Sequence, residues 1–387
     1  MNTTNLIGQM SIKTFIKNTK YLFLPACLIL TGCNHLTRTS EETRGINPQS
    51  ELIQEAFIDS GSPGALISWR NADGKWQRLT LGTQVLGATP LSMDDTMALP
   101  IGSVSKLFVG YTLAHLIDQE NLYWETPLSE VFPDWASEKW NPSVLQFAQH
   151  QSGLFNPIEA EAFQKQILEK PDRVWTDEAL VTFALNQPTQ GEDFGEFHYS
   201  NANSSMLVLM MEKTTGKSFE KLLEELRPEG ASELANFRYH ESTLAETIRG
   251  YRNGKPNWPI GYGDVLVDVT RFSPEWSGAA GNMVATLSDL ESWAPALISG
   301  AGLSDANRKA RHKTVATGME DWEYGAHISY ESGGWGHMGD VPGWSAAVLG
   351  SEDGQQIVIV LCNLSNTPQA MPPAALIAGK IFKRLHP

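Results

Sequence analysis

Two side chains have the residue types and the spacing that nucleophilic catalysis requires. Ser103 and Lys106 are three residues apart in the segment Ser103-Val104-Ser105-Lys106. On a helix, this spacing places both side chains on the same face, within reach of each other. A serine hydroxyl is a poor nucleophile at neutral pH, but a lysine with a lowered proton affinity can accept its proton. The pair therefore predicts an activated serine in the first turn of a helix, where the helix dipole stabilises developing negative charge.

The same spacing occurs again later in the chain, where it predicts no chemistry. Ser218 and Lys221 are also three residues apart, within an amphipathic helical segment. A solvated helix face accounts for that pair. Because the bare spacing is weak evidence, only the surrounding sequence can separate the two pairs.

The sequence around Ser103 and Lys106 contains further blocks in a fixed order. These are Ile101-Gly102-Ser103-Val104-Ser105-Lys106, His150-Gln151-Ser152-Gly153-Leu154, Phe197-His198-Tyr199-Ser200-Asn201, Ala280-Gly281-Asn282-Met283, Ser288-Asp289-Leu290, Gly336-His337-Met338-Gly339 and Pro342-Gly343-Trp344. In this order they resemble the serine β-lactamases and the penicillin-recognising D,D-peptidases, particularly the class C-like branch. The resemblance covers nearly the whole chain from Ser50 to Leu385.

The resemblance implies a catalytic role for four side chains. Ser103 would be the acylated nucleophile, Lys106 its base partner, and Tyr199 the phenol that relays a proton to the leaving group. Asn201 would hold the lysine and the substrate amide. The backbone amides of Ser103 and Asp340 would form an oxyanion hole. A tyrosine suits the relay because a neighbouring cation can lower its pKa toward neutrality.

The third motif departs from the pattern of the family. The resemblance implies substrate binding by His337, Met338, Gly339 and Asp340, where members usually have Lys-Thr-Gly or Lys-Ser-Gly. In those members, the lysine and the hydroxyl bind a substrate carboxylate. His337 is a known variant, but Met338 removes the hydroxyl and Asp340 adds an acid. Recognition of a substrate carboxylate is therefore an open question.

Strand patterns occur at both ends of the chain, and helical patterns lie between them. Apolar strand candidates are 65–69, 76–81, 345–349 and 356–361, and helical periodicity covers 107–118, 176–185, 204–214 and 374–385. We predict an α+β fold in which both chain ends form an antiparallel sheet flanked by helices. Residues 50–118 and 240–387 would form the sheet domain, and 119–239 an inserted, mostly helical region.

The N-terminus has the order of an export signal, with lysines before an apolar stretch. The stretch ends in Leu30-Thr31-Gly32-Cys33, which resembles a bacterial lipoprotein lipobox and implies cleavage before Cys33 and lipidation there. A soluble secretory signal is the alternative. We expect a lipoprotein signal peptide over 1–32, a polar tether over 33–49, and the periplasmic face of the outer membrane as the location.

Composition narrows the set of partners. The net charge of −15 at pH 7 makes nucleic acid an unfavourable partner. Cys362 would be the only thiol left after cleavage and lipidation, so no disulfide framework is expected. The histidines show no metal-ligand spacing, and we expect neither a metal nor another cofactor.

These observations favour a serine hydrolase that forms an acyl-enzyme in the cell envelope. A D-alanyl-D-alanine carboxypeptidase-like peptidase acting on peptidoglycan peptides fits the expected location. A carboxylesterase or a D-amino-acid amidase is the nearest alternative, because neither needs a carboxylate clamp. A β-lactamase and a wall-binding lipoprotein without turnover are the remaining alternatives.

Overall fold

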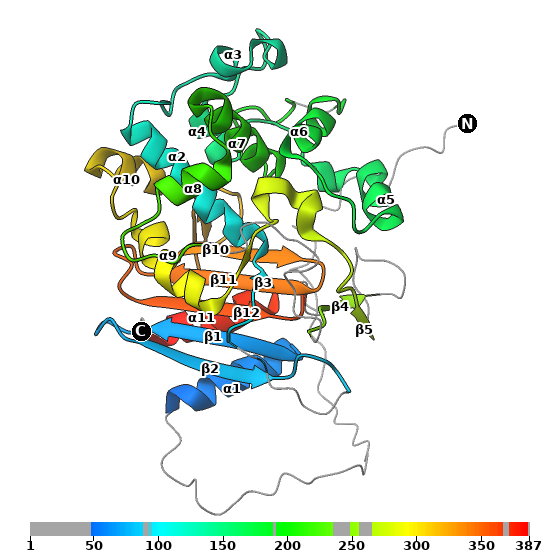
Figure 1. Cartoon of the computed structure of the whole chain (residues 1–387), viewed down its shortest axis with the longest axis vertical. Helices are drawn as coiled ribbons and strands as arrows, with labels where there is room; N and C mark the ends of the chain where they lie inside the picture. The colour runs from blue at the N-terminus through cyan, green and yellow to red at the C-terminus, as the bar shows by residue number, and fades with distance from the viewer. Residues whose placement is uncertain are drawn as a thin grey trace, which may run out of the picture. The chain divides into compact units, whose positions relative to one another are not determined.

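An eight-stranded antiparallel sheet is the central element of the computed structural model (Figure 1). The structure describes residues 48–385 except 88–92, 94, 189–190, 235–247, 255–264 and 367–370, so Cys33 and the predicted signal peptide lie outside the described residues. In spatial order the strands are β2 (Trp76–Gly82), β1 (Gly64–Arg70), β12 (Ile357–Cys362), β11 (Trp344–Gly350), β10 (Gly334–Val341), β9 (Ser329–Glu331), β8 (Trp322–Tyr324) and β7 (Val315–Ala316). The N-terminal hairpin thus pairs with the C-terminal one, and the predicted α+β fold is confirmed.

Two inner strands of the sheet, β11 and β12, are covered on both faces. β11 and β12 are buried along their whole length, and their residues alternate between two apolar clusters because successive side chains point to opposite faces. On one face, α1 (Pro48–Ser60) and α11 (Pro373–Leu385) pack against residues such as Ala347 and Val360. On the other face, α9 (Leu287–Ser299) covers Val348 and Ile359.

Between β3 (Leu99–Pro100) and β4 (Tyr251–Gly254), the described residues form helices and no strand. These helices are η2 (Gly102–Val104), α2 (Ser105–Asp118), α3 (Leu128–Val131), η3 (Pro133–Trp135), α4 (Val144–Ala148), η4 (Pro157–Glu159), α5 (Glu161–Glu169), α6 (Asp177–Leu185), α7 (Ala202–Thr215) and α8 (Phe219–Glu225). The chain then returns toward the sheet through β5 (Val265–Asp268), η6 (Pro274–Ala280), β6 (Val284–Ala285) and α10 (Asp305–His312).

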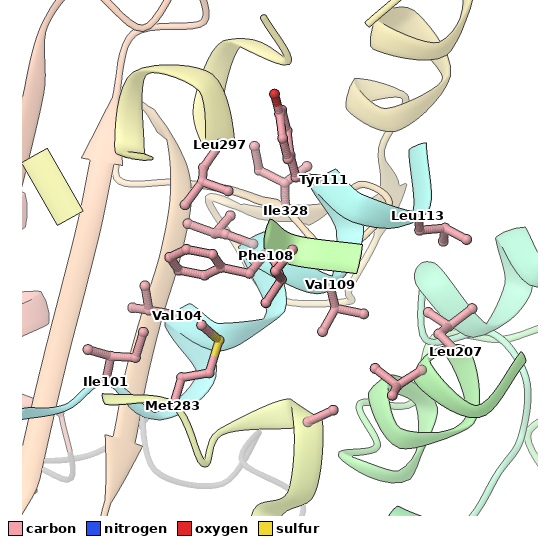
Figure 2. Close-up of a cluster of buried hydrophobic side chains, with 14 of the residues drawn as sticks. Ile101, Val104, Phe108, Val109, Tyr111, Leu113, Leu207, Met283, Leu297 and Ile328 are labelled. Carbon is pink, nitrogen blue, oxygen red and sulfur yellow. The ribbon is translucent and has the colours of Figure 1, made fainter. Parts of the chain in front are cut away.

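α2 runs through the apolar core between the sheet and the other helices. Figure 2 shows Phe108 and Val109 of α2, with Val104 of η2, among Leu207 of α7 and Leu297 of α9. A helix that is apolar all round is typical of a buried helix, and nearly every residue of α2 is buried. It has 14 residues, and none of the described helices is both long enough and apolar enough to cross a membrane. The core therefore fixes the N-terminal end of α2, where Ser103 and Lys106 lie.

Candidate active site

The structure brings Ser103 and Lys106 together at the start of α2. The spacing predicted Ser103 in the first turn of a helix, whereas the structure places it in the short 3₁₀ turn η2, two residues before α2 begins. The turn continues directly into α2, and the two side chains still meet: Lys106 Nζ is 3.0 Å from Ser103 Oγ. Lys106 is fully buried, whereas Ser103 is partly exposed. Only the serine of this pair can therefore meet a substrate directly.

The surroundings of Lys106 favour its neutral form. Burial lowers its pKa well below the ordinary value, because the ammonium form would lose its hydration. Its Nζ also hydrogen-bonds to Asn201 Oδ1 at 2.9 Å and to the carbonyl oxygen of Ala280 at 3.0 Å. A neutral amine can donate its two hydrogens to these two acceptors. Its lone pair then faces the hydroxyl of Ser103, so the amine can accept the proton of that hydroxyl.

Tyr199 completes a triangle with Ser103 and Lys106. Its ring centroid is 4.8 Å from Lys106 Nζ, and its hydroxyl is hydrogen-bonded to Ser103. The prediction that a neighbouring cation lowers the pKa of Tyr199 is wrong. Burial raises that pKa, and the hydrogen bond with Ser103 opposes the rise only in part. With its pKa raised by burial, Tyr199 remains a protonated phenol and is a proton donor.

His150 supports Tyr199 from behind. The two rings lie 4.2 Å apart between centroids, and His150 Nδ1 accepts hydrogen bonds from the backbone N–H of Ser200 and from Asn203 Nδ2. Burial lowers the pKa of His150 well below its ordinary value, so the imidazole is neutral and can accept these bonds. His150 therefore fixes the turn that carries Tyr199.

The free edge of β10 lies directly against Ser103. β9 pairs only with the first residues of β10, from Gly334 to Gly336, which leaves the later residues open on that side. A Cβ on Gly339 would be 2.9 Å from the backbone nitrogen of Ser103, and a Cβ on Gly102 would be 2.7 Å from that of Asp340. Glycine is required at both positions, and the amides of Ser103 and Asp340 are close neighbours. The side chain of Asp340 itself is exposed.

His337 is neutral and supplies no positive charge to the site. Its Nε2 lies 3.0 Å from Tyr324 Oη, and its Nδ1 lies 2.6 Å from the carbonyl oxygen of Met338. The carbonyl can only accept, so Nδ1 carries the proton and Nε2 accepts from the tyrosine. Burial lowers the pKa of His337 to about 3, because the imidazolium form would lose its hydration. A carboxylate-binding cation is therefore absent at this position of the third motif.

A groove of about 900 Å³ opens beside these residues. Tyr199, His337 and Met338 form one part of its wall, and Trp322 and Glu331 form another. Met338, which the resemblance implies for substrate binding, thus lines the groove. The N-terminal end of α11 contributes to the wall as well.

The predicted site residues fall into three groups. Ser103, Lys106, Tyr199 and Asn201 meet directly, and His337 lies with its ring 6.4 Å from that of Tyr199. Gly339 and Asp340 approach through their backbone. The sequence analysis missed Tyr324 and Glu331, because neither belongs to a motif with a recognisable spacing. Among the described residues, no group of three or more His, Cys, Asp and Glu side chains is arranged to hold a metal.

Comparison with known proteins agrees with this geometry. The Beta-lactamase family model matches residues 51–380. A D-stereospecific amidohydrolase from Streptomyces sp. is similar at 23% identity and a TM-score of 0.68, over 82% of this chain and 95% of that one. A D-amino acid amidase from Ochrobactrum anthropi SV3 gives 19% identity and a TM-score of 0.73, over 87% and 99%.

A penicillin binding protein from Bacillus halodurans is also similar, at 18% identity and a TM-score of 0.68, over 86% of this chain and 99% of that one. At these identities the structural likeness establishes the fold. The family model extends over most of the sequence and includes every catalytic residue considered above. The chain is therefore a serine hydrolase that belongs to the beta-lactamase family.

Proposed function

We propose that the protein hydrolyses small amides or esters through an acyl-enzyme on Ser103. One observation carries this proposal: a buried, neutral Lys106 amine lies 3.0 Å from the hydroxyl of a serine that remains accessible. A nucleophile beside a base of lowered pKa is the arrangement that activates serine. Asn201 Oδ1 accepts a hydrogen bond from Lys106 Nζ and so holds the base in place.

The reaction follows from the positions of the donors. Ser103 Oγ attacks the substrate carbonyl carbon while its proton passes to Lys106 Nζ. The backbone N–H groups of Ser103 and Asp340 bind the oxyanion, and Tyr199 donates its proton to the leaving nitrogen or oxygen as the scissile bond breaks. The proton held by Lys106 can then restore the phenol. A water molecule hydrolyses the acyl-enzyme and regenerates Ser103.

Two features favour an amide or an ester whose leaving group carries no carboxylate. His337 is neutral, and Met338 offers no hydroxyl, so the third motif has neither of the groups that would bind a carboxylate. The similar amidohydrolase and amidase support an amide bond next to a D-configured residue as a substrate class. This places amidase or esterase activity ahead of the D-alanyl-D-alanine carboxypeptidase activity that the expected location favours.

Three assays on the purified chain from residue 34 onward separate these activities. We expect hydrolysis of D-phenylalanine amide or p-nitrophenyl acetate, and no release of D-alanine from muropeptides that end in D-alanyl-D-alanine. Intact-mass measurements with benzylpenicillin, using Ser103→Ala as the control, report on acylation. Release of D-alanine together with a stable penicillin adduct would instead establish a D,D-carboxypeptidase, and rapid penicillin turnover would establish a β-lactamase.

We also propose that the enzyme is a lipoprotein of the cell envelope, attached through Cys33. The lipobox before Cys33 and the polar residues after it support this proposal. Expression of the full chain and of the Cys33→Ser variant, followed by membrane fractionation, provides the test. We expect the natural chain in the outer-membrane fraction with the mass of a lipidated cysteine. A natural chain that is cleaved but soluble would support the alternative of a secretory signal.

A further inference from the structure

Exposed apolar side chains gather at the groove beside Tyr199. Met319, Tyr330 and Met371 line it and are 46%, 38% and 48% exposed, which makes them three of the large apolar side chains that the structure leaves in contact with solvent. Trp322 of β8 adds another aromatic ring to the wall. Exposed apolar and aromatic surface in a concave site is typical of a binding site rather than of an ordinary protein surface.

Among the acidic side chains of this wall, Glu331 is the one that is partly buried. It belongs to β9, directly opposite Trp322 in the register of β8 and β9. Its Oε1 accepts a hydrogen bond from Ser329 Oγ at 2.7 Å, and among the described residues it forms no ion pair. Burial raises the pKa of Glu331 to about 7, with no arginine or lysine acting to lower it. A carboxylate in this position gains most from a positive charge brought by a ligand.

Most of the other charges around the groove are also negative. Glu320 and Asp321 line it and are exposed, while Lys383 is the one cationic side chain among the described residues of the wall and is exposed at the end of α11. His337 is neutral, as shown above. An organic cation in the groove would therefore contact both carboxylates and aromatic faces, and aromatic faces attract cations through their ring quadrupoles. An anion would be repelled by most of the charges in the wall.

The position of Tyr199 relates the groove to the reaction. Tyr199 is hydrogen-bonded to Ser103 and also forms part of the groove wall, whereas Ser103 does not line the groove. A substrate attacked by Ser103 thus extends past Tyr199 to enter the groove. This direction is that of the leaving group, because Tyr199 is the proton donor to that group in the proposed function, on which this step of the inference rests.

We infer that the groove binds a positively charged group on the leaving side of the substrate, with Glu331 as its counter-ion and Trp322 and Tyr330 as its aromatic wall. The substrates are then amides or esters of an amino- or ammonium-bearing amine or alcohol. Glu331 determines specificity and takes no part in bond breaking.

Three esters of phenylacetic acid test the inference kinetically. Their alcohols are similar in length and differ in charge: 2-(trimethylammonio)ethanol, 3,3-dimethylbutanol and 4-hydroxybutanoate. We expect kcat/KM to be about 10-fold higher for the cationic ester than for its neutral isostere, and lowest for the anionic ester. Glu331→Gln should bring the cationic-to-neutral ratio close to 1, mainly through KM. The matched variant Glu352→Gln, in the exposed turn between β11 and β12, should retain the natural ratio.

A binding measurement separates this inference from the proposed function. Calorimetric titration of 2-(trimethylammonio)ethanol into Ser103→Ala, and into the same variant carrying Glu331→Gln, requires no turnover. Binding that Glu331→Gln weakens about 10-fold supports the cation site even if none of the esters is hydrolysed. Hydrolysis of all three esters without a preference for the cation, or a preference that Glu331→Gln leaves unchanged, would overturn the inference and leave the proposed acyl-enzyme intact.

Discussion

Two Ser-x-x-Lys segments in this chain have the same spacing and opposite surroundings. Lys106 is fully buried and lies against Ser103 Oγ, Asn201 and a backbone carbonyl. The side chain of Lys221 is 52% exposed and pairs with Glu224 at 2.9 Å. Ser218 accepts a hydrogen bond from the backbone N–H of Lys221 and caps α8. One pair therefore forms an acid–base couple, and the other begins a surface helix.

This difference shows that the environment of the lysine, and not its spacing from the serine, sets its protonation state. Desolvation lowers the pKa of Lys106, whereas the hydrogen bond and the charge of Glu224 raise that of Lys221. Only a neutral lysine can take a proton from a serine. In the sequence, only the neighbouring motifs distinguish the two pairs. The structure shows the physical cause of the difference, which is the burial of Lys106.

Replacement of each serine by alanine should give the largest difference in activity between the two pairs. We expect Ser103→Ala to lower kcat at least about 10⁴-fold, because it removes the group that forms the acyl-enzyme. Ser218→Ala should leave kcat unchanged and lower the free energy of unfolding by about 1 kcal/mol, the usual cost of a lost N-cap. Steady-state kinetics with p-nitrophenyl acetate and urea unfolding check both results. Equal activity of the two variants would remove Ser103 from the mechanism.

Replacement of the two lysines tests the base. Lys106→Met should lower kcat by about 10²- to 10⁴-fold, the range typical of a general base, while Lys221→Met should have no effect on kcat. Methionine is unbranched and one heavy atom shorter than lysine, so it fills most of the same buried space and the fold should be preserved. Single-turnover acylation kinetics provide the measurement. Acylation of Lys106→Met at the natural rate would show that another group activates Ser103.

Tyr199 contacts the Ser103–Lys106 pair, and substitution by phenylalanine removes only its hydroxyl. Tyr199→Phe keeps the ring packed against His150 and should lower kcat about 10²-fold for amides. The loss should be smaller for p-nitrophenyl acetate, since its leaving group departs without a proton. The ratio of the two losses, measured on the same enzyme preparation, is the readout. Equal losses for both substrates would indicate that Tyr199 does not protonate the leaving group.

Stability should respond to pH through Lys106 and not through Lys221. The pKa of Lys106 is lower in the folded chain than its ordinary value of 10.5, so the unfolded chain binds the extra proton between these two values. Stability then rises with pH across that interval. We expect the difference in unfolding free energy between the natural chain and Lys106→Met to increase from pH 7 to 9.5. For Lys221→Met, urea unfolding should give a constant difference, and a rising one would contradict the assignment.

Local patterns predicted the sheet and its helices well. The segments 65–69, 76–81 and 345–349 lie within β1, β2 and β11, and 356–361 is shifted by one residue from β12, because alternating or continuous apolar runs between turn residues are typical of strands. The predicted helix 374–385 is α11. Short strands were not predicted: β7, β8 and β9 have only two or three residues each, too few for a pattern to emerge.

The sequence by itself determined the order of the motifs and the reach of Ser103 to Lys106, because a separation of three residues on a helical turn fixes that geometry locally. Only the tertiary structure decided the chemistry of these groups. The pKa of Lys106, Tyr199 and His337 depends on burial by segments distant in the chain, and no local pattern encodes how completely they exclude water. The groove at Glu331 likewise forms where β8, β9 and α11 meet.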